Sequence, residues 1–158
     1  MQQKGKNLML GKLTILLTMT ALTYTFAADK KLALKDLSPA VQKAVDANLN
    51  GAEIKNINKE TEKGVVQYEV ESLLNGKHRD FNVDSKGTLL VVEEETSIDS
   101  IPAAAKAAIL KKVGTGKLGM VETFTKPGSE TMYEAAYTSK AGKKAEVLVK
   151  ADGTETKE

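Results

Sequence analysis

The residue best suited to acid–base chemistry in this chain is His78, the only histidine among 158 residues. A hydrolase of the Ser-His-Asp or Cys-His type would have to be built around this imidazole. The chain has no cysteine, and the Gly-x-Ser-x-Gly pattern of serine esterases is absent. His78 also follows closely on the Asn75-Gly76 turn, where a solvated side chain is expected. The sequence therefore predicts a protein that is not an enzyme, with a small hydrolase centred on His78 as the distant alternative.

Carboxylates could instead hold a metal ion. Asp80, Asp84 and Asp152 are the candidates, but a calcium loop needs several oxygen ligands along one short segment. The Asp84-Ser85-Lys86-Gly87 stretch supplies one acid and a repelling lysine, so turn formation explains these residues more simply. We predict no metal and no cofactor.

Two further patterns have structural explanations. The run Glu93-Glu94-Glu95 could recruit a basic partner, although a charged strand end also discourages sheets from pairing at their edges. Gly114-Thr115-Gly116 lacks the lysine and the spacing of a phosphate-binding loop and follows a helical segment, so we interpret it as a helix stop.

The amino terminus is typical of a secretory signal. Three lysines precede an apolar run of 14 residues, 13–26, which is shorter than the roughly 20 residues of a membrane span and contains several threonines. We expect cleavage after Ala27, with a retained membrane anchor as the alternative. The mature chain would carry 20 basic and 21 acidic side chains, so no nucleic-acid footprint remains and no stable membrane insertion is expected.

The chain without this segment repeats itself. An offset of 64 residues relates five positions of the first half to the second: Leu37 to Ile101, Val45 to Ile109, Ile54 to Leu118, Ile57 to Val121 and Gly64 to Gly128. The offset grows to 65 at Tyr68 and Tyr133, and to 66 at the pairs Gly76 and Gly142, Phe81 and Val147, Val83 and Val149, and Gly87 and Gly153. Loops tolerate single-residue insertions, so each step marks a connection between elements. We predict a signal peptide over 1–27, a first repeat over 28–97 and a second repeat over 98–158.

Each repeat is predicted to contain one helix followed by four short strands. Ser38 can cap a helix that Pro39 begins, and apolar residues then recur at helical spacing until Asn50-Gly51. Alternating apolar and polar residues over 66–71 and 78–83, joined by Asn75-Gly76, indicate an antiparallel hairpin. In the second repeat we expect a helix ending at Val113 and strands over 118–125, 131–138 and 143–150, with a final stub after Gly153.

The predicted architecture is α+β: two tandem α-β4 repeats form one antiparallel sheet, with both helices packed on one face. The alternation directs Tyr68, Phe81, Tyr133 and Tyr137 toward the helices. It directs a mostly charged row to the opposite face, from which we predict a protein-binding surface made of Glu69, Glu71, His78, Asp80, Glu134, Lys144 and Glu146.

Several short motifs recur in an exported family. Leu37-Ser38-Pro39 or Ile101-Pro102-Ala103 opens a helix, Tyr68-Glu69-Val70 or Tyr133-Glu134-Ala135 lies in a strand, and Asp84-Ser85-Lys86-Gly87-Thr88 or Ala151-Asp152-Gly153-Thr154 forms a turn. This pattern resembles the PepSY-like domains of exported bacterial proteins. It is also similar to the tandem layout of β-lactamase inhibitory proteins.

The resemblance implies a periplasmic or secreted, non-catalytic module that binds another protein of the cell envelope. The alternative that it implies is inhibition of an envelope or secreted peptidase. Such inhibitors bind through aromatic-rich faces, and aromatic anchors carry much of the energy of an interface. The charged row predicted here departs from that pattern.

Overall fold

The computed structural model describes residues 32–62 and 64–157, so the predicted signal peptide lies outside the described residues. A short 3-10 helix, η1 (Leu34–Asp36), leads into the first helix–strand unit. This unit consists of α1 (Pro39–Asn48), β1 (Glu53–Glu62), β2 (Val65–Leu74), β3 (Lys77–Asp84) and β4 (Leu89–Glu95). The second consists of α2 (Ala103–Val113), β5 (Lys117–Thr125), β6 (Met132–Thr138), β7 (Lys144–Val149) and β8 (Glu155–Thr156).

Local sequence signals set the ends of both helices as predicted. The Ser38 hydroxyl accepts a hydrogen bond from the Val41 amide at 3.4 Å, and Pro39 occupies the first turn of α1. Asn50 adopts a positive φ of 49° directly after Leu49, the residue that caps the carboxyl end of that helix. Gly114, with φ of 55°, ends α2, which confirms the glycine-rich segment as a helix stop.

The turns between strands follow from residues that tolerate left-handed backbone. Asn75 and Gly76 both have positive φ, 53° and 82°, as a tight hairpin of this type requires. The Asp84 carboxylate accepts hydrogen bonds from the amides of Lys86 and Thr88, both at 2.8 Å, and Asp152 accepts one from Thr154 at 2.8 Å. These aspartates therefore stabilise turns, as the sequence indicated.

All strands join one antiparallel sheet in the order β1-β2-β3-β4-β5-β6-β7-β8. Directly paired residues point to the same side, so the face can be followed across the sheet. Phe81 of β3 pairs with Val92 of β4, and Val92 pairs with Thr125 of β5, which lies on the same side as Val121. Because Phe81 packs beneath α1 and Val121 beneath α2, both helices cover one face.

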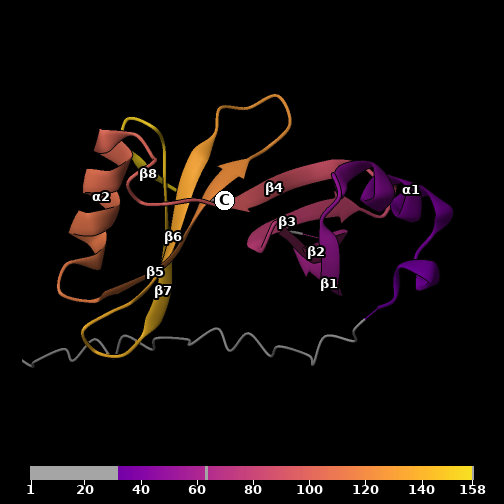
Figure 1. The fold of residues 1–158 in the computed structure, drawn as a ribbon, viewed down its shortest axis with the longest axis horizontal. Coiled ribbons are helices and arrows are strands. Elements are labelled where there is room, and N and C mark those ends of the chain that lie inside the picture. Colours follow the sequence, from indigo (N-terminus) through magenta and orange to yellow (C-terminus); the bar gives the residue numbers. More distant parts are fainter. Residues whose placement is uncertain (1–31, 63, 158) are drawn as a thin grey trace, which may run out of the picture.

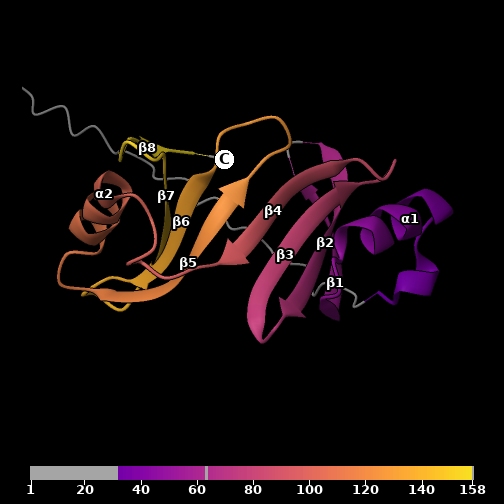
Figure 2. The same ribbon diagram turned by 45° about the horizontal axis from the view of Figure 1, so that its top comes forward.

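The two helices nevertheless lie at opposite ends of the molecule, with the sheet between them (Figures 1 and 2). Neighbouring strands in a sheet are rotated by roughly 20 to 25°, and this twist accumulates over eight strands. The covered face therefore turns with the sheet from α1 to α2. Each helix buries its own core, one around Phe81 and Val45 and the other around Ile109 and Val147.

The duplication extends to single packing contacts. A Cβ placed on Gly87 would lie 2.6 Å from the backbone oxygen of Ala40 in α1. A Cβ placed on Gly153 would lie 2.7 Å from the backbone oxygen of Ala104 in α2. Both glycines also have positive φ, 85° and 84°, as predicted. In each repeat, the same glycine lets the turn that follows the third strand pack directly on the helix.

Candidate functional site

The face of the sheet that carries no helix contains a broad hollow of about 660 Å³. We call this side the helix-free face. Residues from β1 through β7 line the hollow, so its wall spans both repeats. Eight of the lining side chains are carboxylates: Glu60, Glu62, Glu69, Asp80, Glu93, Glu122, Glu134 and Glu146. Lys126 is the one basic residue in this lining.

An apolar group is also found on this face. Val91, Phe124 and Leu148 are buried there, with Met132 packed against them, and we call these four residues the outer cluster. Val91 and Phe124 line the hollow. Phe124 is only 2 % exposed although no helix covers it. The Lys126 ammonium lies above the Phe124 ring, 5.3 Å from its centroid. Negative charge and apolar surface therefore meet at the middle of the sheet.

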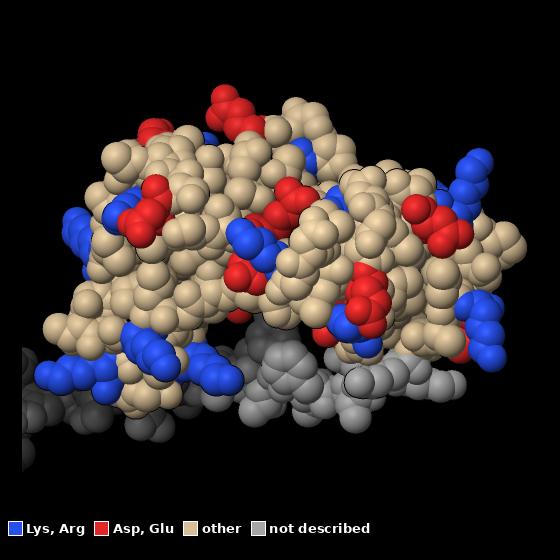
Figure 3. All heavy atoms as spheres, in the orientation of Figure 1, with Lys and Arg blue, Asp and Glu red and all other residues tan. Residues whose placement is uncertain are grey.

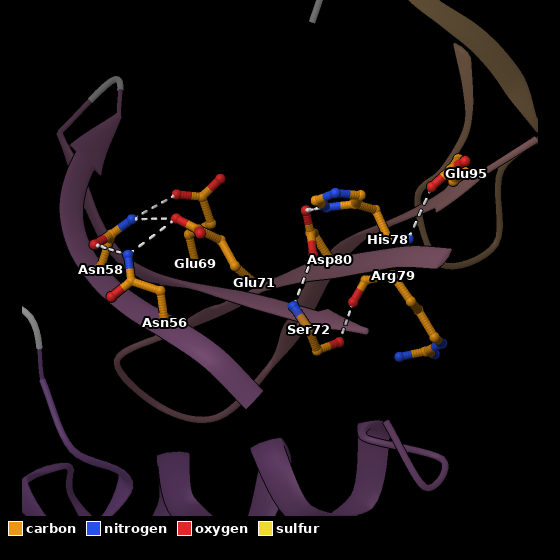
Figure 4. A network of polar contacts seen from close by, with 9 residues as sticks. All are labelled: Asn56, Asn58, Glu69, Glu71, Ser72, His78, Arg79, Asp80 and Glu95. Atoms are coloured by element: carbon orange, nitrogen blue, oxygen red, sulfur yellow. Dashed lines mark hydrogen bonds and ion pairs between the residues drawn. The ribbon is translucent and has the colours of Figure 1, made fainter. Parts of the chain in front are cut away.

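In the first repeat, side-chain amides satisfy the carboxylates. Asn58 donates to Glu69 at 3.2 Å and to Glu71 at 2.9 Å, and Asn56 donates to Glu71 at 3.0 Å (Figure 4). Glu60 of β1 accepts from Gln67 of β2 at 2.7 Å and from Asn82 of β3, two strands away, at 3.1 Å. This amide network holds these three acids in place, because amide donors offset part of the cost of burying a carboxylate.

Burial raises the pKa of the Glu69 carboxyl above its ordinary value. The hydrogen bond from Asn58 opposes that shift, and the neighbouring charges of Glu60, Glu71 and Asp80 add to it. Asp80 also has a raised pKa, caused first by burial and opposed by the hydrogen bond from the Ser72 amide, 2.8 Å long. These acids are therefore partly desolvated, and a cation placed beside them would stabilise their charged forms.

Glu122 of β5 has no such support. It is paired directly with Glu95 of β4 on one side and with Glu134 of β6 on the other. Its Oε1 atom is buried and has no hydrogen-bond partner among the described residues. Burial, followed by the charge of Asp80, raises the pKa of Glu122. Like charges directly opposite each other destabilise a sheet, so the row formed by Glu95, Glu122 and Glu134 destabilises the folded protein.

All seven residues of the predicted binding surface lie on the helix-free face, but the hollow gathers only part of them. Glu69, Asp80, Glu134 and Glu146 line it. Glu71 lies beside it in the amide network. The side chain of His78 is half exposed and lies 3.8 Å from Asp80, measured from Nδ1 to Oδ2 (Figure 4).

Lys144 lies apart, in a second hollow of about 450 Å³ that it shares with Lys117 and Glu146. Basic side chains gather at the lower left of Figure 3, beside the hairpin between β6 and β7, which carries Lys140, Lys143 and Lys144. The positive end of the sheet therefore adjoins the acidic hollow, because Glu146 lines both hollows. Among the described residues, no group of histidine, aspartate and glutamate side chains is arranged to hold a metal ion.

One sequence interpretation was wrong. The run Glu93-Glu94-Glu95 does not protect a sheet edge, because β4 is paired on both sides, with β3 and with β5. Glu94 points to the helix side and accepts a hydrogen bond from Arg79 at 3.1 Å. Glu93 lines the hollow instead.

Sequence reasoning also missed Glu122, Phe124 and Leu148. A signal for them existed, since strict alternation from Val121 places Glu122 and Phe124 on the side away from α2. The expectation for the four aromatic residues that were placed on the helix side is confirmed, because Tyr68, Phe81, Tyr133 and Tyr137 all pack there.

No protein-family model matches this chain, and no curated protein resembles it in sequence. Solved structures do share its fold. One is a protein of Bacteroides eggerthii that is provisionally classed as periplasmic, with a TM-score of 0.61, 16% identity, and coverage of 77% of this chain and 86% of that chain. Another is a DUF2874 family protein of Bacteroides uniformis, with a TM-score of 0.60, 16% identity, and coverage of 75% and 86%.

A BLIP-like protein of Bacteroides fragilis has a TM-score of 0.55 and 22% identity, and the match covers 77% of this chain and 84% of that chain. Identities this low establish the fold alone. The chain therefore has a BLIP-like α+β fold, as the resemblance to the inhibitory proteins implied. No match supports the PepSY-like part of that resemblance.

Proposed function

We propose that this chain is an exported, non-catalytic binding module that recognises a basic protein partner in the cell envelope through its helix-free face. The observation that carries the proposal is the acidic hollow. Glu122, held between Glu95 and Glu134, opposes folding, and no residue that the structure describes donates a hydrogen bond to its buried Oε1 atom. Binding sites commonly sacrifice stability in this way, because a charge left unsatisfied in the free protein can be satisfied by a partner.

Export to the periplasm or beyond is supported by the lysine-led apolar segment over 1–27 and by structural neighbours that are provisionally classed as periplasmic. No helix within the described residues is long and apolar enough to cross a membrane. Intact-mass measurement of the exported protein should show a chain that begins at Ala28. A full-length mass in a membrane fraction would contradict the proposal of export with cleavage.

Peptidase inhibition is the alternative function, suggested by the likeness to a BLIP-like protein. Tight inhibitors place exposed aromatic anchors at the centre of their interface. Here the helix-free face carries Phe124 at 2 % exposure, surrounded by acids, which favours weaker and salt-sensitive association. A binding module for a basic partner therefore fits the surface better than a tight inhibitor.

Neutral substitutions in the hollow test the proposal most cleanly. Reversing Glu69 and Glu71 to lysine would also break their hydrogen bonds with Asn56 and Asn58 and would disturb the fold. The double variant Glu122→Gln and Glu146→Gln removes two charges from the hollow and preserves side-chain shape.

The matched control removes two acids near the helices, Asp46→Asn and Asp99→Asn. All three proteins serve as baits in pull-downs from a native envelope extract at low and high salt. We expect a protein that the parent and the control retain at low salt and that the hollow variant loses. Equal retention by all three baits would place the binding surface elsewhere.

A further inference from the structure

The aromatic ring in the hollow is set apart from the other aromatic side chains. Of the five aromatic residues within the described chain, four pack on the helix side, and Phe124 alone lies on the helix-free face. The face of an aromatic ring attracts a cation, and a surrounding row of carboxylates strengthens that preference. Phe124 lies in such a row, since Glu93 is its direct neighbour on β4 and Glu122 is two residues away on β5.

The chain places one of its own cations on this ring. The Lys126 ammonium lies 5.3 Å from the Phe124 centroid, and Lys126 is the single basic residue against eight acids in the lining of the hollow. A lysine or arginine side chain from a partner would find the same two features there. Its apolar stem would contact the ring and its charged head would approach the carboxylates.

The Lys126 side chain is also positioned so that it can move away from the Phe124 ring. It is the first residue after β5, which ends at Thr125, and it opens the turn that contains Gly128. Its backbone oxygen accepts a hydrogen bond from the Ser129 amide at 3.0 Å within that turn. Swinging the side chain off the ring therefore breaks no hydrogen bond of the β5 ladder.

The geometry points to a cation–aromatic subsite in which Lys126 holds, in the free protein, the position that a lysine or arginine side chain of the partner takes in the complex. This inference rests on the proposed function and specifies the partner's chemistry. Lys126 acts as an internal competitor: it shields Phe124 and part of the acidic charge until a basic segment displaces it. Binding then replaces the contact between Lys126 and Phe124 with a contact between the partner's cation and Phe124.

The test uses a fluorescent synthetic peptide of alternating lysine and glycine, titrated at low salt into the protein without its signal segment. Lys126→Met keeps the apolar stem and removes the charge, and Lys126→Gln serves as a second variant. Lys140→Met, in the exposed hairpin between β6 and β7, removes the same charge away from the hollow. Thermal melts confirm that each variant is folded.

We expect Lys126→Met and Lys126→Gln to tighten peptide binding by about three- to ten-fold, the range set by one cation–aromatic contact. Lys140→Met should change it by less than about two-fold, because Lys140 is exposed and does not line the hollow, and exposed charges are strongly screened by salt. In nuclear magnetic resonance spectra of the parent, the ring should shift the ε-methylene protons of Lys126 upfield. Saturation with the peptide should return them toward the values of a free lysine.

The outcomes separate this inference from the proposed function. If the peptide binds and Glu122→Gln weakens it, but the Lys126 variants behave like Lys140→Met, the internal competitor is refuted and the acidic binding face stands. The same conclusion follows if the Lys126 protons stay upfield in the complex. If the peptide binds none of the proteins, both proposals fail.

Discussion

The two repeats are alike on the helix side of the sheet and different on the helix-free face. Beneath the helices, Ile57 and Val121 are both buried, and Gly87 and Gly153 make the same contact with the helix above them. On the helix-free face, four residues of the first repeat that carry side-chain amides are replaced by other residue types in the second. Asn56, Asn58, Gln67 and Asn82 correspond to Met120, Glu122, Met132 and Leu148.

This difference explains where the site lies. Packing against a helix limits which residues fit, so the helix side kept its pattern after duplication. The free face has no such limit. In the first repeat it became a network of amides that satisfies its own acids, and in the second it became apolar and acidic without amide donors. The candidate site forms where the two surfaces meet, across β4 and β5.

The largest predicted effect tests the shared part of the comparison. Gly87→Ala and Gly153→Ala should each destabilise the fold by about 3 kcal/mol or more, because positive φ costs roughly 1 to 2 kcal/mol and the added carbon clashes with a backbone oxygen. Urea denaturation measures both losses. Gly76→Ala, at similar φ but with open space around it, is the matched control and should lose only the backbone term. Equal losses of stability at all three positions would show that the close contact of Gly87 and Gly153 with the helices does not contribute to stability.

The next effect tests a contact that only the first repeat has. Arg79 is buried, donates to the backbone oxygen of Asn48 at the end of α1 at 2.6 Å, and stacks on Phe81. The corresponding residue of the second repeat is Ala145. Arg79→Ala should cost about 2 kcal/mol, because the Asn48 carbonyl loses its charged donor and a cavity opens beside Phe81.

Arg79→Met is the control for this change, since it retains the packing of the stem and should recover part of the stability. Glu94→Gln should have a small effect, because Glu94 is more than half exposed and an ion pair in water contributes little. If Glu94→Gln lowers the free energy of unfolding as much as Arg79→Ala does, the main stabilising contact of Arg79 is its ion pair with Glu94. Its hydrogen bond to the backbone oxygen of Asn48 would then contribute little.

The sequence was sufficient to predict the two main helices, the strands, and the face occupied by the residues of the clearly alternating strands. Apolar residues at every second position determine the side of a strand, and Asn-Gly or Gly turns determine where it ends, so local signals agree with the fold. The slips of one residue between repeats did mark connections: the Gly64 turn between β1 and β2, and the hairpins of β2 with β3 and β6 with β7.

The site itself could be predicted only in part. Glu69, Asp80, Glu134 and Glu146 follow from alternation within single strands. The role of Glu93 depends on β4 pairing with β5 across the two repeats, which no pattern within one repeat reveals. The conflict at Glu122 likewise appears only when three strands are aligned in register, because its two acidic neighbours lie on different strands, Glu95 on β4 and Glu134 on β6.

Exchanging the matched residues Asn58 and Glu122 tests the difference between the repeats directly. Asn58→Glu removes the donor to Glu69 and Glu71 and adds a third charge, and it should destabilise the fold by about 1 to 2 kcal/mol. Glu122→Asn relieves repulsion from Glu95 and Glu134 and should stabilise it by up to about 1 kcal/mol. Urea denaturation of both variants gives the signs. Destabilisation by both changes would mean that Glu122 has a structural role that the contacts do not show.

The smallest effect is a dependence on pH that runs in opposite directions for stability and for binding. Glu69 and Glu122 have pKa values raised above their ordinary value of 4.5, and Asp80 has one raised above 3.8. Between the ordinary and the raised pKa, the folded state binds more protons than the unfolded state, so stability falls as pH rises through this window. Asp84 and Asp152 have lowered pKa values, and their contribution is lost only as pH falls below the ordinary 3.8.

Urea denaturation should therefore show a stability that declines as pH rises above the ordinary value of 4.5 for Glu69 and Glu122, and that also declines as pH falls below 3.8. Binding of the lysine–glycine peptide should weaken as pH falls through the window above these ordinary values, because protonation removes the charges that attract it. Glu122→Gln should flatten both curves, since Glu122 is one of the three raised groups. Protonation of the acids in the hollow should thus stabilise the parent protein and weaken its binding of the peptide. If stability and peptide binding instead rose together with pH, these acids would not form the binding site.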